Sequence, residues 1–248
     1  MIMCVHPQFV TFKEFGSFDA SCMKKVEDIT GEKDPQEQAL VCSYPYQESI
    51  HNVTHVRKLK TYFQTRYPGA TIKNVFIPPN ATPKLIVQKI IAAKPAGKQL
   101  TVMKLSSHGD SGLLFLAGNP PSIPLHVGNV DPFAELKPHF YAPASVIQLQ
   151  GCGVASNTSI IAGGSDTDPV LVAGTWRGGV GLGYELLSRL AYLTGVPVHA
   201  ALHPLSDKGT DFEPWDSYAN DTVYVTPDGR AWLSWEQRWV TPPTPDWQ

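Results

Sequence analysis

A cysteine and a histidine each follow an apolar run that ends in an abrupt turn. Cys152 stands in a Gly-Cys-Gly turn after the run at 146–149, and His108-Gly109 follows the run at 100–105. A thiolate is the nucleophile of cysteine catalysis, and a nearby histidine can accept the thiol proton and later protonate the leaving group. We therefore expect the two runs to be neighbouring strands that bring His108 and Cys152 together at one edge of a sheet.

The residues beside this pair suggest supporting roles. Gly109 and Gly151 let the chain turn sharply and let a substrate backbone approach. The backbone N–H groups of Gly109 and Cys152 are candidate donors to a developing oxyanion. Asp110 is a candidate support for His108, although a cap of the turn is the favoured interpretation.

Strands alternate with helices along the chain, which indicates an α/β fold. We expect a three-layer sandwich with a mainly parallel central sheet of about six strands, plus a C-terminal hairpin at 222–235. Residues 1–37 are expected to be an N-terminal arm, and residues 38–248 a single α/β domain with a loop-rich C-terminal end. The expected strands cover 39–43, 71–77, the runs at 100–105 and 146–149, 169–175 and 196–202, and the expected helices cover 48–67, 82–93, 131–140 and 183–194.

The composition of the chain argues against several classes of function. The chain has 248 residues, of which 42% are hydrophobic and 17% charged, and its net charge is −2. This balance favours neither nucleic acid nor an anionic membrane as the main partner. The apolar stretches fall far short of the roughly 18 residues of a membrane span, and the N-terminus lacks the pattern of a secretory signal. We expect a cytoplasmic protein, which is compatible with a secreted effector, and the oligomeric state stays open.

The four cysteines predict no metal site. Cys4, Cys22, Cys42 and Cys152 show no metal-ligand spacing and no close cluster with histidine. In a cytosolic chain they are expected to be free thiols. We expect neither a metal nor a cofactor.

Two motifs resemble those of caspases. The segment Ser107-His108-Gly109-Asp110-Ser111-Gly112 resembles their Ser-His-Gly-x-x-Gly, and Gln150-Gly151-Cys152-Gly153 resembles their Gln-Ala-Cys-x-Gly. The histidine precedes the cysteine by close to the ~50 residues of that family. The wider family of caspase-like cysteine peptidases places strand–His-Gly and then strand–x-Cys on a parallel sheet with helices on both sides. Segments 151–155 and 183–198 look closer to its bacterial, CHAT-type members, and the resemblance covers roughly residues 38–202.

The resemblance implies an activity and a set of residues. His108 would be the general base, Cys152 the nucleophile, and the amides of Gly109 and Cys152 the oxyanion donors. The reaction would be hydrolysis of a peptide bond in a protein or peptide substrate through a thioester, with autoprocessing in the loop at 155–168 as one form of it. Gly151 replaces the alanine of the caspase pattern, and Val154 replaces its second glycine.

The sequence defines the substrate specificity less well than it defines the catalytic residues. Thr175-Trp176-Arg177 resembles a caspase Ser-Trp-Arg segment whose arginine binds an acidic side chain. Alignment through the following helix instead places Thr175 and Trp176 on the preceding strand, so aspartate specificity is not inferred. Arg177 stays a candidate pocket residue, and Asp166 or Asp168 could serve a pocket for a basic side chain.

Other interpretations stay open. The chain could be a caspase-like binding or regulatory module without turnover, or a Cys-His enzyme with another acyl-transfer outcome, such as deamidation or transglutamination. His199 and His203 would be the bases in an arrangement whose nucleophile precedes its histidine, but Gln150 and Val154 break the Gly-x-nucleophile-x-Gly pattern. The tryptophans of the tail are expected to pack a terminal hairpin on the core, with a peptide-binding surface as the alternative: Trp215, Trp232, Trp235 and Trp239.

Overall fold

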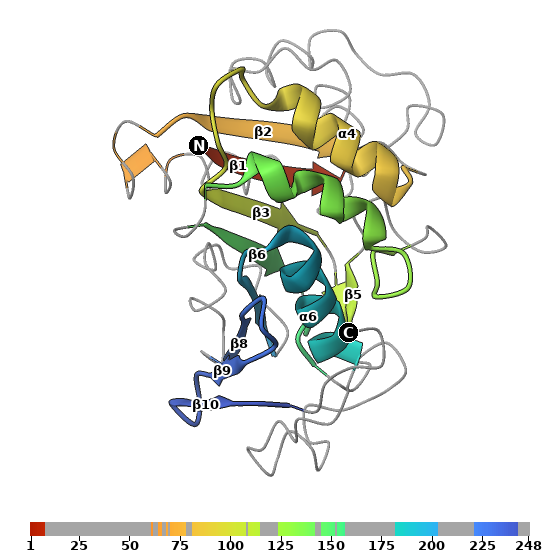
Figure 1. Ribbon diagram of the computed structural model, residues 1–248, viewed down its shortest axis with the longest axis vertical. Helices are drawn as coiled ribbons and strands as arrows, with labels where there is room; N and C mark the ends of the chain where they lie inside the picture. The colour runs from red at the N-terminus through yellow and green to blue at the C-terminus, as the bar shows by residue number, and fades with distance from the viewer. Residues whose placement is uncertain are drawn as a thin grey trace, which may run out of the picture.

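A sheet of eight strands organises the described part of the protein (Figure 1). The computed structural model describes residues 1–7, 61, 64–65, 68, 70–77, 81–107, 109–114, 124–141, 145–151, 153–156, 182–202 and 221–242. The strands of the sheet are β1 (Ile2–Pro7), β2 (Ile72–Ile77), β3 (Val102–Ser106), β6 (Val146–Gln150), β7 (Val198–Ala201), β8 (Thr222–Val225), β9 (Ala231–Leu233) and β10 (Arg238–Val240).

Most of the sheet is parallel. Strands β2, β1, β3, β6 and β7 lie side by side in that order and run parallel, and β8, β9 and β10 continue the sheet as an antiparallel meander. The protein is thus a mixed α/β protein with a mainly parallel sheet, as the alternation of strands and helices predicts. The expected C-terminal hairpin is confirmed as β8 and β9.

In the described part of the chain, three helices lie in a row across one face of this sheet (Figure 1). They are α4 (Pro83–Ala93), the 3-10 helix η2 (Asp131–His139) and α6 (Leu182–Thr194). At the start of α4, the Thr82 hydroxyl accepts the N–H of Leu85 at 3.2 Å, which caps the helix as the Thr-Pro sequence predicts. On this helix Leu85 is 38% exposed, whereas Val87 is buried.

The two faces of the sheet differ in chemistry. The face toward the helices is apolar, with these side chains fully buried: Met103, Leu105, Ile147, Leu149, Val198 and Ala200. The alternate residues Lys104, Gln148 and His199 lie opposite one another on β3, β6 and β7, and they are buried as well. Both faces are therefore covered at the centre of the sheet. The second helical layer of the expected three-layer sandwich lies outside the described residues.

The first strand corrects the expectation of an N-terminal arm. Ile2–Pro7 forms β1, which pairs with β2 on one side and with β3 on the other. The N-terminal amine donates to the carbonyl of Gln99 at 3.0 Å, and the Thr101 N–H donates to the carbonyl of Met1 at 2.8 Å. These residues belong to the interior of the sheet because they pair on both sides, while residues 8–37 lie outside the described part.

Most of the other expected elements that fall within the described residues are confirmed. These are β2, α4, β3, β6, α6 and β7, and η2 is a 3-10 rather than an α-helix. An antiparallel bridge joins Leu114 to Leu125. The expected strands at 39–43 and 169–175, most of the helix at 48–67 and residues 157–168 of the loop lie outside the described part.

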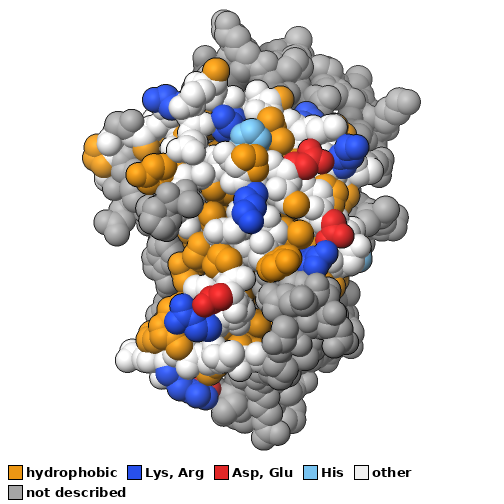
Figure 2. All heavy atoms as spheres, viewed as in Figure 1, with side chains coloured by type: hydrophobic (Ala, Val, Ile, Leu, Met, Phe, Trp, Pro, Cys, Tyr) orange, Lys and Arg blue, Asp and Glu red, His pale blue; other side chains and the backbone are white. Residues whose placement is uncertain are grey.

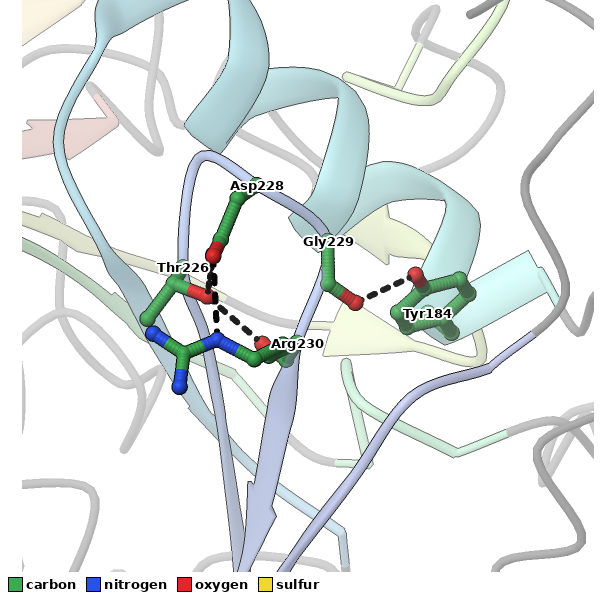
Figure 3. Close-up of polar contacts among 5 residues, drawn as sticks. All are labelled: Tyr184, Thr226, Asp228, Gly229 and Arg230. Atoms are coloured by element: carbon green, nitrogen blue, oxygen red, sulfur yellow. Dashed lines mark hydrogen bonds and ion pairs between the residues drawn. The ribbon is translucent and has the colours of Figure 1, made fainter.

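The turn between β8 and β9 is held by its own polar side chains (Figure 3). The Thr226 hydroxyl bonds to the Asp228 carboxylate, and the Arg230 Nε donates to the same carboxylate at 2.9 Å. Gly229 has a φ of +82°, which the Asp-Gly turn requires. From α6, the Tyr184 hydroxyl donates to the Gly229 carbonyl at 2.8 Å, so the turn is fastened to the helical layer.

The surface over the helices carries both signs of charge. Figure 2 shows Lys and Arg side chains beside Asp and Glu side chains on this face. One such pair joins α6 to η2, with Arg189 Nη2 2.8 Å from Asp131 Oδ1. A mixture of signs weakens the long-range field of a surface. Within the described residues, no helix has the length and apolar character needed to cross a membrane.

Candidate active site

Strands β3 and β6 are direct neighbours, as the sequence predicts for the two strands that precede His108 and Cys152. They pair in parallel with Ser106 opposite Gln150, and the Ser107 N–H donates to the Gln150 carbonyl at 2.9 Å. Each candidate residue follows its paired strand end by two positions. Both loops therefore leave the same edge of the sheet, at the carboxyl ends of parallel strands, where open α/β sheets bind ligands.

The candidate side chains themselves lie outside the described residues. This holds for His108 and Cys152 and also for the candidate pocket residues Asp166, Asp168 and Arg177. The immediate neighbours of the first two are described. Their contacts fix where the two loops run.

Gly109 and Gly151 bring the two loops into direct contact. A Cβ atom placed on Gly109 would lie 3.1 Å from Gly151 Cα and 2.6 Å from Val154 Cγ2. A Cβ atom on Gly151 would lie 3.1 Å from Gly109 Cα and 2.9 Å from the same methyl group. The space that side chains would need is thus filled by protein. In the direction of the Cβ atoms, these glycines make room for each other and for Val154; the approach of a substrate backbone to them stays a prediction.

The N–H group of Gly109 points away from the small hairpin that follows it. Gly109 lies in β4 (Gly109–Asp110), opposite Leu114 in β5 (Leu113–Leu114). The N–H and carbonyl of Leu114 both bond to Leu125, at 3.0 and 2.8 Å. In an antiparallel ladder, residues alternate between bonded and non-bonded pairs, so Gly109 and Leu114 form a non-bonded pair. The amide of Gly109 therefore remains directed away from β5.

The turn between β4 and β5 fastens the loop after Cys152. The Gly112 N–H donates to the Val154 carbonyl at 3.0 Å, and the Ser111 hydroxyl donates to the Ser156 carbonyl. Asp110 is buried, and its Oδ1 accepts the N–H of Ser111 at 2.8 Å. This contact lies within the turn, and a role of Asp110 in support of His108 stays a prediction.

The same loop is fastened on its other sides by β7 and α6. The Ala155 N–H donates to the Ala201 carbonyl at 3.0 Å, and Gly153, with a φ of +58°, lets the chain turn between Cys152 and Val154. In the first turn of α6, a Cβ atom on Gly183 would lie 2.4 Å from the carbonyl oxygens of Ala155 and Ser156. Hydrogen bonds and close packing thus hold residues 153–156 on three sides.

His199, the alternative base, lies in the middle of β7 and not at the sheet edge. It is opposite Gln148 and Tyr224, and its ring meets the Tyr224 ring edge-on, with 5.8 Å between centroids. Burial, with a smaller contribution from the positive charge of Lys104, lowers the pKa of His199 to about 3. His199 is therefore neutral at neutral pH and placed for packing. His203 lies outside the described residues.

Aromatic side chains of the meander pack against one another at an angle. The rings of Trp232 and Trp239 are 5.7 Å apart, and Tyr224 meets Trp239 edge-on at 6.1 Å. Trp235 is partly buried against the core, as expected for a packed hairpin, whereas Trp239 is 45% exposed and carries the Arg230 guanidinium over its ring. Trp215 lies outside the described residues.

Within the described part of the chain, no three His, Cys, Asp or Glu side chains are grouped so that they could hold a metal ion. The absence of a metal and a cofactor stays a prediction. No protein-family model matches the chain, and none of the curated proteins matches it. The candidate site therefore rests on its own residues and their geometry.

Proposed function

We propose that the protein is a caspase-like cysteine endopeptidase, with Cys152 as the nucleophile and His108 as the general base. One observation carries the proposal: Gly109 and Gly151, each adjacent to one of these residues, are in backbone contact at the carboxyl ends of paired parallel strands. His108 and Cys152 follow these strand ends by the same number of positions, and the proposal requires their side chains to come within hydrogen-bond reach for proton transfer.

The chemistry follows from these positions. His108 accepts the thiol proton of Cys152, and the thiolate attacks the carbonyl carbon of the scissile peptide bond. The oxyanion that forms is bound by the N–H groups of Gly109 and Cys152. His108 then protonates the leaving amine, which departs with the C-terminal part of the substrate. Water hydrolyses the remaining thioester and regenerates the thiol.

The layout of the sheet supports this class of peptidase. A strand followed by His-Gly lies beside a strand followed by x-Cys on a parallel sheet, as in the caspase-like peptidases that the two motifs resemble. The direction of the Gly109 amide, away from β5, suits an oxyanion donor. Asp166, Asp168 and Arg177 stay candidate pocket residues, and the acidic or basic preference of the pocket is left to experiment.

Cleavage of a peptide library, analysed by mass spectrometry, tests this function. The wild-type chain should produce new peptide termini, and Cys152→Ser and His108→Ala should each abolish them, while Cys42→Ser should leave the cleavage rate unchanged. Glutamine side chains converted without new termini would instead identify a deamidase. A folded wild-type chain that cleaves no peptide and does not process itself would refute the endopeptidase and favour a binding module.

A further inference from the structure

Val154 lies where the two candidate loops meet. Its side chain is fully buried, and its Cγ2 methyl group occupies the space beside both Gly109 and Gly151. Of the atoms near a Cβ placed on Gly109, this methyl group is the nearest, at 2.6 Å. A single side chain thus packs on both glycines.

The backbone of Val154 cannot move away from this contact without breaking hydrogen bonds. Its carbonyl accepts the Gly112 N–H at 3.0 Å, and the N–H of the next residue, Ala155, donates to Ala201 at 3.0 Å. The first contact ties Val154 to the His108 side of the site, and the second ties it to β7. The side chain is therefore a fixed packing contact that joins the loop of Cys152 to the loop of His108.

We propose that Val154 is a positioning residue that sets the separation between the loop of His108 and the loop of Cys152. The inference rests on the proposed function, since it assigns Val154 a role in the same site. Proton transfer between a thiol and an imidazole needs hydrogen-bond distance, and a misplacement of about 1 Å can slow a reaction on the order of a hundredfold. A spacer that contacts both loops controls this distance although it touches no substrate.

The proposal makes a prediction opposite to the one that the resemblance makes. The caspase pattern has glycine at this position, so resemblance alone expects Val154→Gly to be harmless or beneficial. In this chain, glycine would leave a void on the side of Gly109 and Gly151 that the Val154 methyl group fills, and the two loops would no longer be held in one relative position.

The test is the rate at which iodoacetamide alkylates Cys152, measured across pH, with the modified cysteine located by mass spectrometry. Val154→Ala and Val154→Gly are compared with Val225→Ala and Val225→Gly. Val225 is an equally buried valine in β8, away from the two loops. Both pairs lower the melting temperature through the same lost methyl groups, and rates are taken where circular dichroism shows each variant to be folded.

We expect the Val154 variants to lose about tenfold or more of the alkylation rate at pH 7, and their rate profile to shift toward that of a free thiol. The Val225 variants should keep the wild-type profile. In a His108→Ala background, Val154→Ala should have no further effect, because the distance that it changes no longer matters.

Three results would overturn the proposal. If wild-type Cys152 reacts like a free thiol, the Cys-His dyad is refuted, and the positioning role of Val154 is refuted with it. A reactive wild type whose profile is unchanged in both Val154 variants would refute the positioning role and leave the peptidase intact. An equal shift of the profile in the Val225 variants would show that the shift comes from the loss of overall stability and not from the position of Val154.

Discussion

The β8–β9 turn is held mainly by hydrogen bonds among its own residues, whereas the loops after β3 and β6 are held by contacts with each other. In the turn, Thr226, Asp228 and Arg230 bond to one another within five residues of sequence, and Gly229 is needed for its positive φ. Between the loops, Ser111 bonds to a residue 45 positions away, and Gly109 and Gly151 are needed because no side chain fits between them.

The comparison separates two uses of glycine. A turn that needs backbone freedom can be specified mainly by neighbouring residues, and here a single described hydrogen bond from Tyr184 joins the turn to α6. A contact between two backbones depends on both strands, on the filler Val154 and on the elements that press the loops together. Substitutions at the second kind of site should therefore have larger effects, and these should reach the reactivity of Cys152.

The largest effect is expected for Gly183→Ala. The added Cβ would lie 2.4 Å from the carbonyl oxygens of Ala155 and Ser156, so α6 or the loop must shift. We expect the free energy of unfolding, measured in urea, to fall by about 3 kcal/mol. An ordinary helical glycine gains up to ~1 kcal/mol from the same change. A gain in stability at Gly183 would contradict the close packing of α6 on this loop.

Gly109→Ala should follow, with a loss of about 2 kcal/mol in the free energy of unfolding. Its control is Gly97→Ala, because Gly97 has a φ of +73° and nothing within 4 Å of an added Cβ. That control measures backbone strain alone, roughly 1 kcal/mol.

The double variant Gly109→Ala/Val154→Ala isolates the collision with the valine. Removing the methyl group at 2.6 Å should make the double variant more stable than the sum of the single changes predicts. Strict additivity would place the two residues out of contact.

His199 lies on β7, the strand between the two regions, because β7 pairs with β6 on one side and with β8 on the other. The unfolded chain binds a proton at His199 near pH 6.5, and the folded chain does so only near its pKa of about 3. Unfolding therefore takes up a proton between these values, and the free energy of unfolding should fall by about 1.4 kcal/mol for each pH unit lowered. In His199→Gln, unfolding should take up one proton fewer, so the free energy of unfolding should depend less steeply on pH. Equal slopes in the two proteins would contradict a buried neutral histidine.

Tyr184→Phe should have the smallest effect. It removes the hydrogen bond to the Gly229 carbonyl, which should lower the free energy of unfolding by about 1 kcal/mol. Tyr192→Phe is the control on the same helix, because Tyr192 is 50% exposed and should change stability by less than ~0.5 kcal/mol. Alkylation of Cys152 should be unchanged in both variants. Slower alkylation of Cys152 in Tyr184→Phe would mean that the β8–β9 turn and the candidate site are coupled.

Local signals explain what the sequence could predict. Thr82-Pro83 starts α4, Asp228-Gly229 turns the β8–β9 hairpin, and apolar runs identify β3 and β6. The neighbouring position of β3 and β6 follows from their shared pattern, and the structure confirms it. Apart from that adjacency, these features depend on residues close together in the chain.

Long-range pairing explains what the sequence could not predict. β1 begins with the short apolar run at 2–5, but its place inside the sheet depends on pairing with β2 on one side and β3 on the other. The packing of Val154 on Gly109 and Gly151 depends on the register of two strands, although the three residues all lie in the motifs that drew attention to the site. Lys104 and Gln148 are buried on the face away from the helices, which no periodicity indicates.

The central claim is that His108 activates Cys152, and the pH dependence of Cys152 alkylation in the wild type and in His108→Ala tests it most directly. The account predicts fast, selective labelling with an apparent pKa below the ~8.5 of a free thiol, and a return toward that value in His108→Ala. Labelling of Cys152 that is no faster than that of Cys22, and that is the same in both proteins, would contradict it.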